Sequence, residues 1–250
     1  MTFKSAVSGG VLTVGVFVKT PSPIVVEVLS LTDLDCLCLD AEHAPFDRSA
    51  IDGCVMAARA AGKPVLVRPA SSSAEHIQTA LDCGASGVVL PHIRSADDAR
   101  WAVSATHFGP GGRGYSSSTR SAGYNAKSMA THLALSAAET LVVVQIEDVE
   151  AIEAIDAIAT VPGVDVLFVG RIDLTVAMGA PSPDDARVVA AVDAVCDAGR
   201  RHGKTVGMFL NRPGDVAMWK AKGASVFLLG SDHVFLTSGA EAMMERATRD

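Results

Sequence analysis

Residues 141–174 read LVVVQIEDVEAIEAIDAIATVPGVDVLFVGRIDL, and this stretch decides the fold. It contains two apolar runs, 141–146 and 164–169, that are rich in β-branched residues and have ordinary strand length. Between the runs, isoleucines recur at helical spacing, so the stretch predicts a strand–helix–strand unit. Because the strands of such a unit are parallel, their carboxyl ends meet at one edge of a sheet, where Glu147 and Asp173 would lie close together.

The same alternation of apolar runs and helical segments extends along the whole chain. No hairpin signal separates the runs, and their nearly continuous apolar character indicates burial on both faces of a sheet. The sequence therefore predicts a (β/α)8 barrel, with residues 1–250 as a single domain, and an open doubly wound sheet as the alternative. The eight expected strands are 14–18, 36–40, 65–68, 87–90, 141–146, 164–169, 206–210 and 226–229.

Composition narrows the class of protein. Hydrophobic residues make up 49% of the 250 residues, which is enough for a large core. The 21 Lys and Arg against 28 Asp and Glu give a net charge of −7, which argues against a nucleic-acid partner because phosphate binding needs a basic face. No apolar run approaches the roughly 20 residues of a membrane span, so no membrane association is expected. The five cysteines lie in apolar runs, and we expect a reducing cytoplasm.

In a barrel of this kind, chemistry takes place at the carboxyl ends of the strands. Placing two carboxylates, Glu147 and Asp173, in one dry pocket costs several kcal/mol per ion unless a cation compensates, and oxygen ligands suit Mg²⁺ or Mn²⁺. The alternatives are an ion pair with Arg68 or Arg171, or plain solvation. The residues expected at the strand ends are Phe17, Asp40, Glu42, His43, Arg68, His92, Gln145, Glu147, Asp173 and Asn211.

Other strand-end residues allow two interpretations each. Arg68 ends an apolar strand, where its guanidinium would bind a carboxylate or an enolate oxygen, or form a structural ion pair across the barrel mouth. His43 is a candidate general acid or base, or a hydrogen-bonded loop residue. His92 is interpreted as structural. A turn at Gly170 would offer backbone N–H groups to a substrate carboxylate.

Six strings occur along nearly the whole chain in a recognisable order: LDAEHAP (39–45), VRP (67–69), VLP (89–91), GRG (112–114), QIE (145–147) and GVDVLFVGRID (163–173). Together and in this order they resemble the HpcH/HpaI aldolase family. Members of that family are metal-dependent class II pyruvate aldolases on a (β/α)8 barrel. They are commonly hexamers, as trimers of dimers, and exchange their last helix between subunits.

The resemblance implies an aldolase that cleaves or forms 4-hydroxy-2-oxo acids through a pyruvate enolate, with an aldehyde as the second partner. Glu147 and Asp173 would ligate Mg²⁺ or Mn²⁺, with Co²⁺ as a further candidate. Arg68 would hold the enolate oxygen, and His43 would be the acid/base, coupled to Asp82 from a neighbouring subunit. The substrate-binding residues that the resemblance implies are Phe17, Arg68, Gln145, Gly170, Arg171, Ile172, Asp173 and Leu210.

Two positions depart from the family pattern. Arg171 stands where proline is frequent, and Phe17 stands where tryptophan is frequent. We expect Arg171 to add positive charge at the cleft mouth and to select an anionic acceptor.

Three expectations remain about activity and assembly. Because related enzymes cleave acyl-CoA thioesters or form citrate from oxaloacetate, a citrate-synthase-like or acyl-CoA lyase activity is an alternative. A non-catalytic metabolite-binding barrel is a third hypothesis. The apolar character of the last expected helix, 233–248, predicts packing beyond its own barrel and hence a homo-oligomer.

Overall fold

The computed structural model describes residues 1–249 and contains a closed barrel of eight parallel strands. Each strand pairs with the next along the chain, and β8 closes the barrel against β1. The predicted (β/α)8 barrel is therefore confirmed, and the open sheet is wrong. The strands are β1 (Thr13–Val18), β2 (Cys36–Asp40), β3 (Val65–Arg68), β4 (Gly87–Leu90), β5 (Leu141–Ile146), β6 (Val166–Val169), β7 (Thr205–Leu210) and β8 (Ala224–Ser231).

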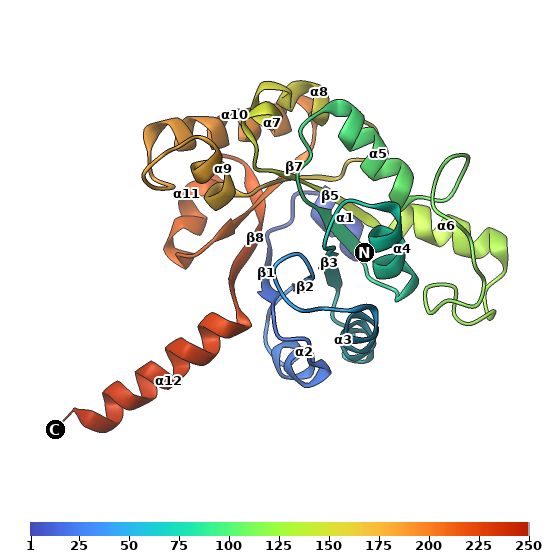
Figure 1. Ribbon diagram of the computed structural model, residues 1–250, viewed down its shortest axis with the longest axis horizontal. Coiled ribbons are helices and arrows are strands. Elements are labelled where there is room, and N and C mark those ends of the chain that lie inside the picture. Colours follow the sequence, from blue (N-terminus) through green and yellow to red (C-terminus); the bar gives the residue numbers. More distant parts are fainter. Residues whose placement is uncertain (250) are drawn as a thin grey trace.

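Helices surround the barrel (Figure 1). The helix expected between β5 and β6 is interrupted at Ala154, and the turn expected at Gly170 leads directly into a helix. The helical elements are α1 (Phe3–Ser8), α2 (Pro23–Ser30), α3 (Arg48–Ala60), α4 (Ala74–Asp82), α5 (Ala96–Thr106), α6 (Met129–Glu139), α7 (Val149–Glu153), α8 (Ile155–Ala159), α9 (Arg171–Ala177), α10 (Ala186–His202), η1 (Pro213–Asp215), α11 (Val216–Ala221) and α12 (Asp232–Thr248).

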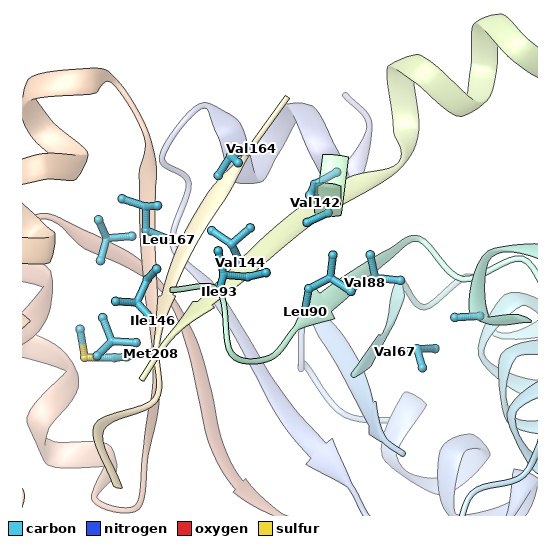
Figure 2. Packing of buried hydrophobic residues seen from close by; sticks show 14 of the residues in the cluster. Val67, Val88, Leu90, Ile93, Val142, Val144, Ile146, Val164, Leu167 and Met208 are labelled. Atoms are coloured by element: carbon cyan, nitrogen blue, oxygen red, sulfur yellow. The ribbon is translucent and has the colours of Figure 1, made fainter. Parts of the chain in front are cut away.

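Apolar side chains form two cores because neighbouring residues of a strand point to opposite faces. The outer core joins the strands to the helices, and Figure 2 shows part of it, including Val67, Val88 and Val144. The inner core fills the barrel and includes Cys38, Leu66 and other strand residues.

Helix α1 closes the amino-terminal end of the barrel. Val7 of this helix is fully buried in the inner core, and its carbonyl accepts a hydrogen bond of 2.9 Å from the Thr205 hydroxyl. The opposite end, where the strands finish, is therefore the end at which polar side chains can meet.

The polar residues at the ends of β2 and β3 also point into the barrel. Cys38 and Leu66 belong to the inner core, so Asp40 and Arg68, two residues further on, also point inward. On β7 the inward residue is Phe209, whose ring lies 5.7 Å from that of Phe17. Leu210, one residue further on, belongs to the outer core instead.

Helix α12 projects away from the barrel (Figure 1). Its first residue, Asp232, is buried and accepts hydrogen bonds from the backbone N–H groups of Lys19 (2.7 Å) and Thr20 (3.0 Å). Beyond that anchor, the helix exposes the apolar side chains of Val234, Phe235, Leu236, Met243 and Met244.

None of the helices in residues 1–249 combines the length and the apolar character that a membrane crossing requires.

Candidate active site

Asp40 and Arg68 lie opposite each other at the ends of β2 and β3. The Asp40 carboxylate is fully buried, and its Oδ1 lies 3.0 Å from Arg68 Nε and 2.8 Å from Arg68 Nη2. Its Oδ2 lies 2.9 Å from Lys19 Nζ. Burial by itself raises the pKa of Asp40, but the charges of Arg68 and Lys19 outweigh it, so the pKa of this carboxyl falls below its ordinary value.

The Arg68 guanidinium is held on three sides. Besides Asp40, its Nε lies 3.2 Å from Glu42 Oε2, and its Cζ stacks 4.5 Å from the centre of the Phe17 ring. Within residues 1–249, no hydrogen bond or ion pair uses Nη1. A fixed, nearly buried guanidinium with one free nitrogen is suited to bind an oxygen anion in the barrel mouth.

Glu147 follows β5 and is 3% exposed. Its Oε1 accepts a 2.9 Å hydrogen bond from the backbone N–H of His92, and its Oε2 accepts one from Gln145 Nε2. Burial raises the pKa of Glu147; the Asp173 charge adds to this, and the two hydrogen bonds oppose it. Gln145 Oε1 is also buried and has no partner among the described residues.

The backbone at Gly170 packs directly against Glu147. A Cβ at Gly170 would lie 2.7 Å from Glu147 Oε2 and 2.9 Å from Glu147 Cβ, so only glycine fits. This contact brings the start of α9 against Glu147, near enough for the Asp173 charge to act on the Glu147 carboxyl. None of the hydrogen bonds and ion pairs found in the described chain uses the Asp173 carboxylate, which is exposed.

His92 lies in the same cluster, although the sequence led us to interpret it as structural. It adopts a left-handed backbone conformation with a φ of 55°, which is uncommon for residues other than glycine and concentrates at functional sites. Its Nδ1 lies 3.3 Å from Glu147 Oε1 and 3.2 Å from Asp148 Oδ2. His92, Glu147 and Asp148 offer ligand atoms close enough together to hold a cation.

Sequence reasoning missed Asp148. Its carboxylate also binds Arg94, with Oδ1 3.1 Å from Nη2 and Oδ2 3.1 Å from Nε. The signal that could have identified it is its position immediately after Glu147, at the carboxyl end of a buried strand.

Two contacts join the arginine side of the mouth to the carboxylate side. Glu42 Oε2 lies 3.2 Å from Arg68 Nε, and Glu42 Oε1 lies 3.8 Å from His92 Nε2. His92 in turn contacts Glu147. The structure therefore brings Arg68, Gln145 and Glu147 into one site, as the strand pattern predicts.

Comparison with known proteins identifies the family. The model of the HpcH/HpaI aldolase/citrate lyase family matches residues 13–238, which is most of the chain. The chain belongs to this family. The sequence-based assignment is thereby confirmed, including its class as a carbon–carbon lyase.

The similarity to individual members extends over almost the full length. A 5-keto-4-deoxy-D-glucarate aldolase of Shigella dysenteriae is 33% identical over 235 residues, covering 92% of this chain and 90% of that one. A solved HpcH/HpaI family protein of Burkholderia cenocepacia is 28% identical and superposes with a TM-score of 0.93, covering 98% of both chains. The solved citrate synthase SbnG is 26% identical, with a TM-score of 0.88, covering 98% of this chain and 97% of that one.

His43, the predicted acid/base of this family member, lies beside the site. Its backbone N–H donates to Asp40 Oδ1 at 3.2 Å, and its Nε2 lies 3.6 Å from Glu42 Oε2. The side chain is 56% exposed, so the ring is free to reach a substrate or a neighbouring subunit.

Asp82 lies far from His43 within one chain, at the end of α4 near the amino-terminal end of the barrel. Its Oδ1 pairs at 2.5 Å with Nη2 of Arg113, a buried guanidinium whose pKa is lowered by burial. The predicted coupling of Asp82 to His43 concerns two subunits, and it stays a prediction.

The remaining predicted residues divide between the mouth and its surroundings. Phe17 lines the mouth under Arg68, Ile172 is exposed on the first turn of α9, and Leu210 faces the helices. The Arg171 side chain is 6% exposed and stacks 5.0 Å from the centre of the Trp219 ring. We expected Arg171 to offer a free positive charge at the cleft mouth, but this charge is already matched by neighbouring carboxylates.

Proposed function

We propose that the protein is a divalent-metal-dependent aldolase that splits a 4-hydroxy-2-oxo acid into pyruvate and an aldehyde. One observation carries this proposal: the buried Glu147 carboxylate and the fixed Arg68 guanidinium occupy the same barrel mouth, linked through Glu42 and His92. An acidic group for a cation and a guanidinium for an oxygen anion are the two elements that enolate chemistry requires.

The donor atoms fit a hard divalent cation. Glu147 and Asp173 would hold the metal, since both are carboxylates and Asp173 is free of other partners in the described chain. The orphaned Gln145 Oε1 and the close approach of Gly170 indicate a cradle shaped for an additional group. Oxygen donors favour Mg²⁺ or Mn²⁺, while the nearby imidazole of His92 leaves Co²⁺ as a further candidate. A bound cation would supply Lewis acidity for the 2-oxo group.

The protein's own side chains would orient the substrate and move its protons. Arg68 Nη1 would donate to the oxygen that becomes negative when the carbon–carbon bond breaks, and Phe17 and Asp40 keep the guanidinium in place. The N–H groups in the first turn of α9, at residues 171–173, have no partner among the described residues and would bind the substrate carboxylate, with Ile172 beside it. His43 would take the proton from the 4-hydroxyl group.

The named relatives indicate a substrate class. In 5-keto-4-deoxy-D-glucarate, the keto group adjoins one carboxylate, and a hydroxyl lies two carbons beyond it. It is therefore a 4-hydroxy-2-oxo acid when it is numbered from that carboxylate. Aldol cleavage gives pyruvate and a three-carbon aldehyde that carries the second carboxylate, and we propose this diacid as the first substrate to assay.

A citrate-synthase-like activity is the second candidate, favoured by the likeness to SbnG. It would use the same enolate chemistry on oxaloacetate and acetyl-CoA. The family assignment favours an enzyme over a non-catalytic metabolite-binding barrel.

We also propose a homo-oligomer, a hexamer built as a trimer of dimers. The exposed apolar face of α12, which projects from the barrel, supports exchange of this helix between subunits. The five free, buried cysteines support a reducing cytoplasm.

The test is a substrate comparison with Mg²⁺ or Mn²⁺ present. Purified protein is incubated either with 5-keto-4-deoxy-D-glucarate, with pyruvate release followed by coupled NADH oxidation, or with oxaloacetate and acetyl-CoA, with free thiol measured. Pyruvate release from the first substrate supports the aldolase. Thiol release from acetyl-CoA, with no pyruvate formed from 5-keto-4-deoxy-D-glucarate, would replace it with the citrate-synthase-like candidate.

A further inference from the structure

Arg171 lies one residue after Gly170 and two before Asp173, so its side chain is attached to the turn that carries the proposed metal ligand. The guanidinium does not point to solvent. Its Nη2 donates to the Pro183 carbonyl at 2.9 Å, and its plane lies over the indole of Trp219 on α11. Figure 1 shows α9 and α11 on the same side of the barrel.

Four charged side chains form an alternating ring at this place, which we call the clasp: Arg171, Asp184, Arg212 and Asp215. Arg171 lies 3.5 Å from Asp184 Oδ1 and 4.0 Å from Asp215 Oδ2. Arg212 closes the ring, with bonds of 2.8 and 3.0 Å to Asp184 and 2.9 Å to Asp215. Two positive charges match two negative charges, so the clasp leaves no unpaired positive charge to bind a substrate.

The clasp joins three segments that are distant in the sequence. Arg171 begins α9, Asp184 lies in the connection before α10, and Asp215 ends η1 after β7. A small cavity of about 200 Å³ lies beside it.

The Asp173 carboxylate depends on this anchoring because no side chain in the described chain binds it directly. Its position is set by the backbone of α9, which has only seven residues. Gly170 fixes that backbone against Glu147, and Arg171 ties it through the clasp to Pro183, Asp184 and Asp215.

We infer that Arg171 is a positioning residue: through the clasp it holds the first turn of α9 so that Asp173 faces Glu147 at the proposed metal site. This inference rests on the proposed function. It assigns to Arg171 a role in metal binding in place of selection of an anionic acceptor. Partners of this kind, which orient a ligand without touching the metal, typically change metal affinity by about 10- to 100-fold when they are removed.

Whether loss of the Arg171 charge weakens or tightens metal binding distinguishes a positioning role from a purely electrostatic one. Arg171→Met removes a positive charge near a cation site, which by itself would tighten binding of the cation. Loss of positioning would weaken it. Methionine retains an unbranched side chain that can pack on Trp219, so the indole stays covered.

The experiment measures Mn²⁺ binding to the metal-free full chain by electron paramagnetic resonance, without substrate, at a temperature well below each variant's melting point. We expect Arg171→Met to raise the Kd for Mn²⁺ about tenfold. The matched control is Arg100→Met, since Arg100 is exposed and its guanidinium contacts only Asp97 among the described residues; we expect its Kd to stay within about twofold of the unmodified value.

Asp184→Asn provides a second route if Arg171→Met does not fold. Asp184 is 56% exposed, so the fold tolerates its neutralisation, yet both arginines of the clasp lose their shared carboxylate. This change also removes a negative charge, which by itself would weaken cation binding, so Asp185→Asn is the charge-matched control: Asp185 is the next residue and lies outside the clasp. We expect the Kd of Asp184→Asn to rise about threefold relative to that control.

Two outcomes would overturn the inference, and they differ from each other. If Glu147→Gln and Asp173→Asn abolish Mn²⁺ binding while Arg171→Met and Asp184→Asn bind normally or more tightly, the metal site stands and Arg171 does not position it. If Glu147→Gln and Asp173→Asn bind Mn²⁺ normally, the metal assignment itself fails, and the role of Arg171 fails with it.

Discussion

Arg68 donates from Nε to Asp40 Oδ1 at 3.0 Å, between directly paired residues of β2 and β3, and its Nη1 is left without a partner in residues 1–249. This geometry predicts that the guanidinium fork is needed for catalysis. Arg68→Lys keeps the charge but loses the fork, so we expect kcat to fall by roughly 10²- to 10³-fold. Steady-state kinetics check this, with Arg100→Lys, an exposed arginine paired with Asp97, as the control. Unchanged kcat in Arg68→Lys would show that catalysis does not need the guanidinium fork.

Asp40 contributes to stability as well as to the site. Asp40→Asn leaves Arg68 and Lys19 without their buried counter-charge, so we expect the free energy of unfolding at pH 7 to fall by about 3–5 kcal/mol. Urea unfolding measures this, and Asp97→Asn at an 88% exposed position should change it by less than about 0.5 kcal/mol. Equal stability of Asp40→Asn and the unmodified chain would mean that this ion pair contributes nothing net.

The same carboxylate predicts a pH dependence. The folded pKa of Asp40 is lower than its ordinary value of 3.8, so ionisation of Asp40 stabilises the fold above about pH 4. That contribution is lost as the pH falls through the lowered folded pKa. We therefore expect the stability difference between the unmodified chain and Asp40→Asn to shrink below pH 4. A difference that stays constant from pH 7 to pH 3 would contradict the lowered pKa.

Gly170 should tolerate no side chain. In Gly170→Ala the added Cβ would lie 2.7 Å from Glu147 Oε2, so the carboxylate or the first turn of α9 must move. We expect metal affinity to fall at least about tenfold while the barrel stays folded, as judged by circular dichroism and Mn²⁺ titration. Gly214→Ala is the control because a Cβ there meets no atom within 4 Å. Normal Mn²⁺ binding by Gly170→Ala would show that this close approach does not shape the site.

The order of strands could be predicted from the sequence because each buried parallel strand is a continuous apolar run. The residues at strand ends, among them Asp40, Arg68 and Glu147, follow from the same pattern, since alternation within a strand fixes which side chains point inward.

What the sequence could not predict depends on side-chain direction outside the strands. Arg171 turns onto Trp219 and two carboxylates that lie far away in the chain, and no local pattern specifies those contacts. The left-handed conformation that brings His92 onto Glu147 is likewise a tertiary effect. Asp148 was missed because an acidic residue directly after Glu147 is typical of the solvent-exposed start of a helix. Only the structure shows its contacts with Arg94.

The exposed apolar face of α12 predicts assembly. Replacing Phe235 and Met243 by glutamate places charges on side chains that are 42% and 61% exposed in the single chain, so folding should be unaffected. In an oligomer these positions would be buried, so the two glutamates should dissociate it into smaller species. Light scattering at micromolar concentration would detect this dissociation. Met218→Glu, at an exposed site on α11, serves as the control. A monomeric unmodified chain would contradict the assembly outright.

The most direct test of the account is aldol cleavage after removal of metal. The protein is treated with a chelator, dialysed, and assayed for pyruvate release from 5-keto-4-deoxy-D-glucarate before and after addition of Mn²⁺ or Mg²⁺. We predict that activity is lost on chelation and restored by either cation, and that Glu147→Gln is not restored. Full activity in the chelated protein would contradict the central claim that a cation held by Glu147 and Asp173 acts opposite Arg68.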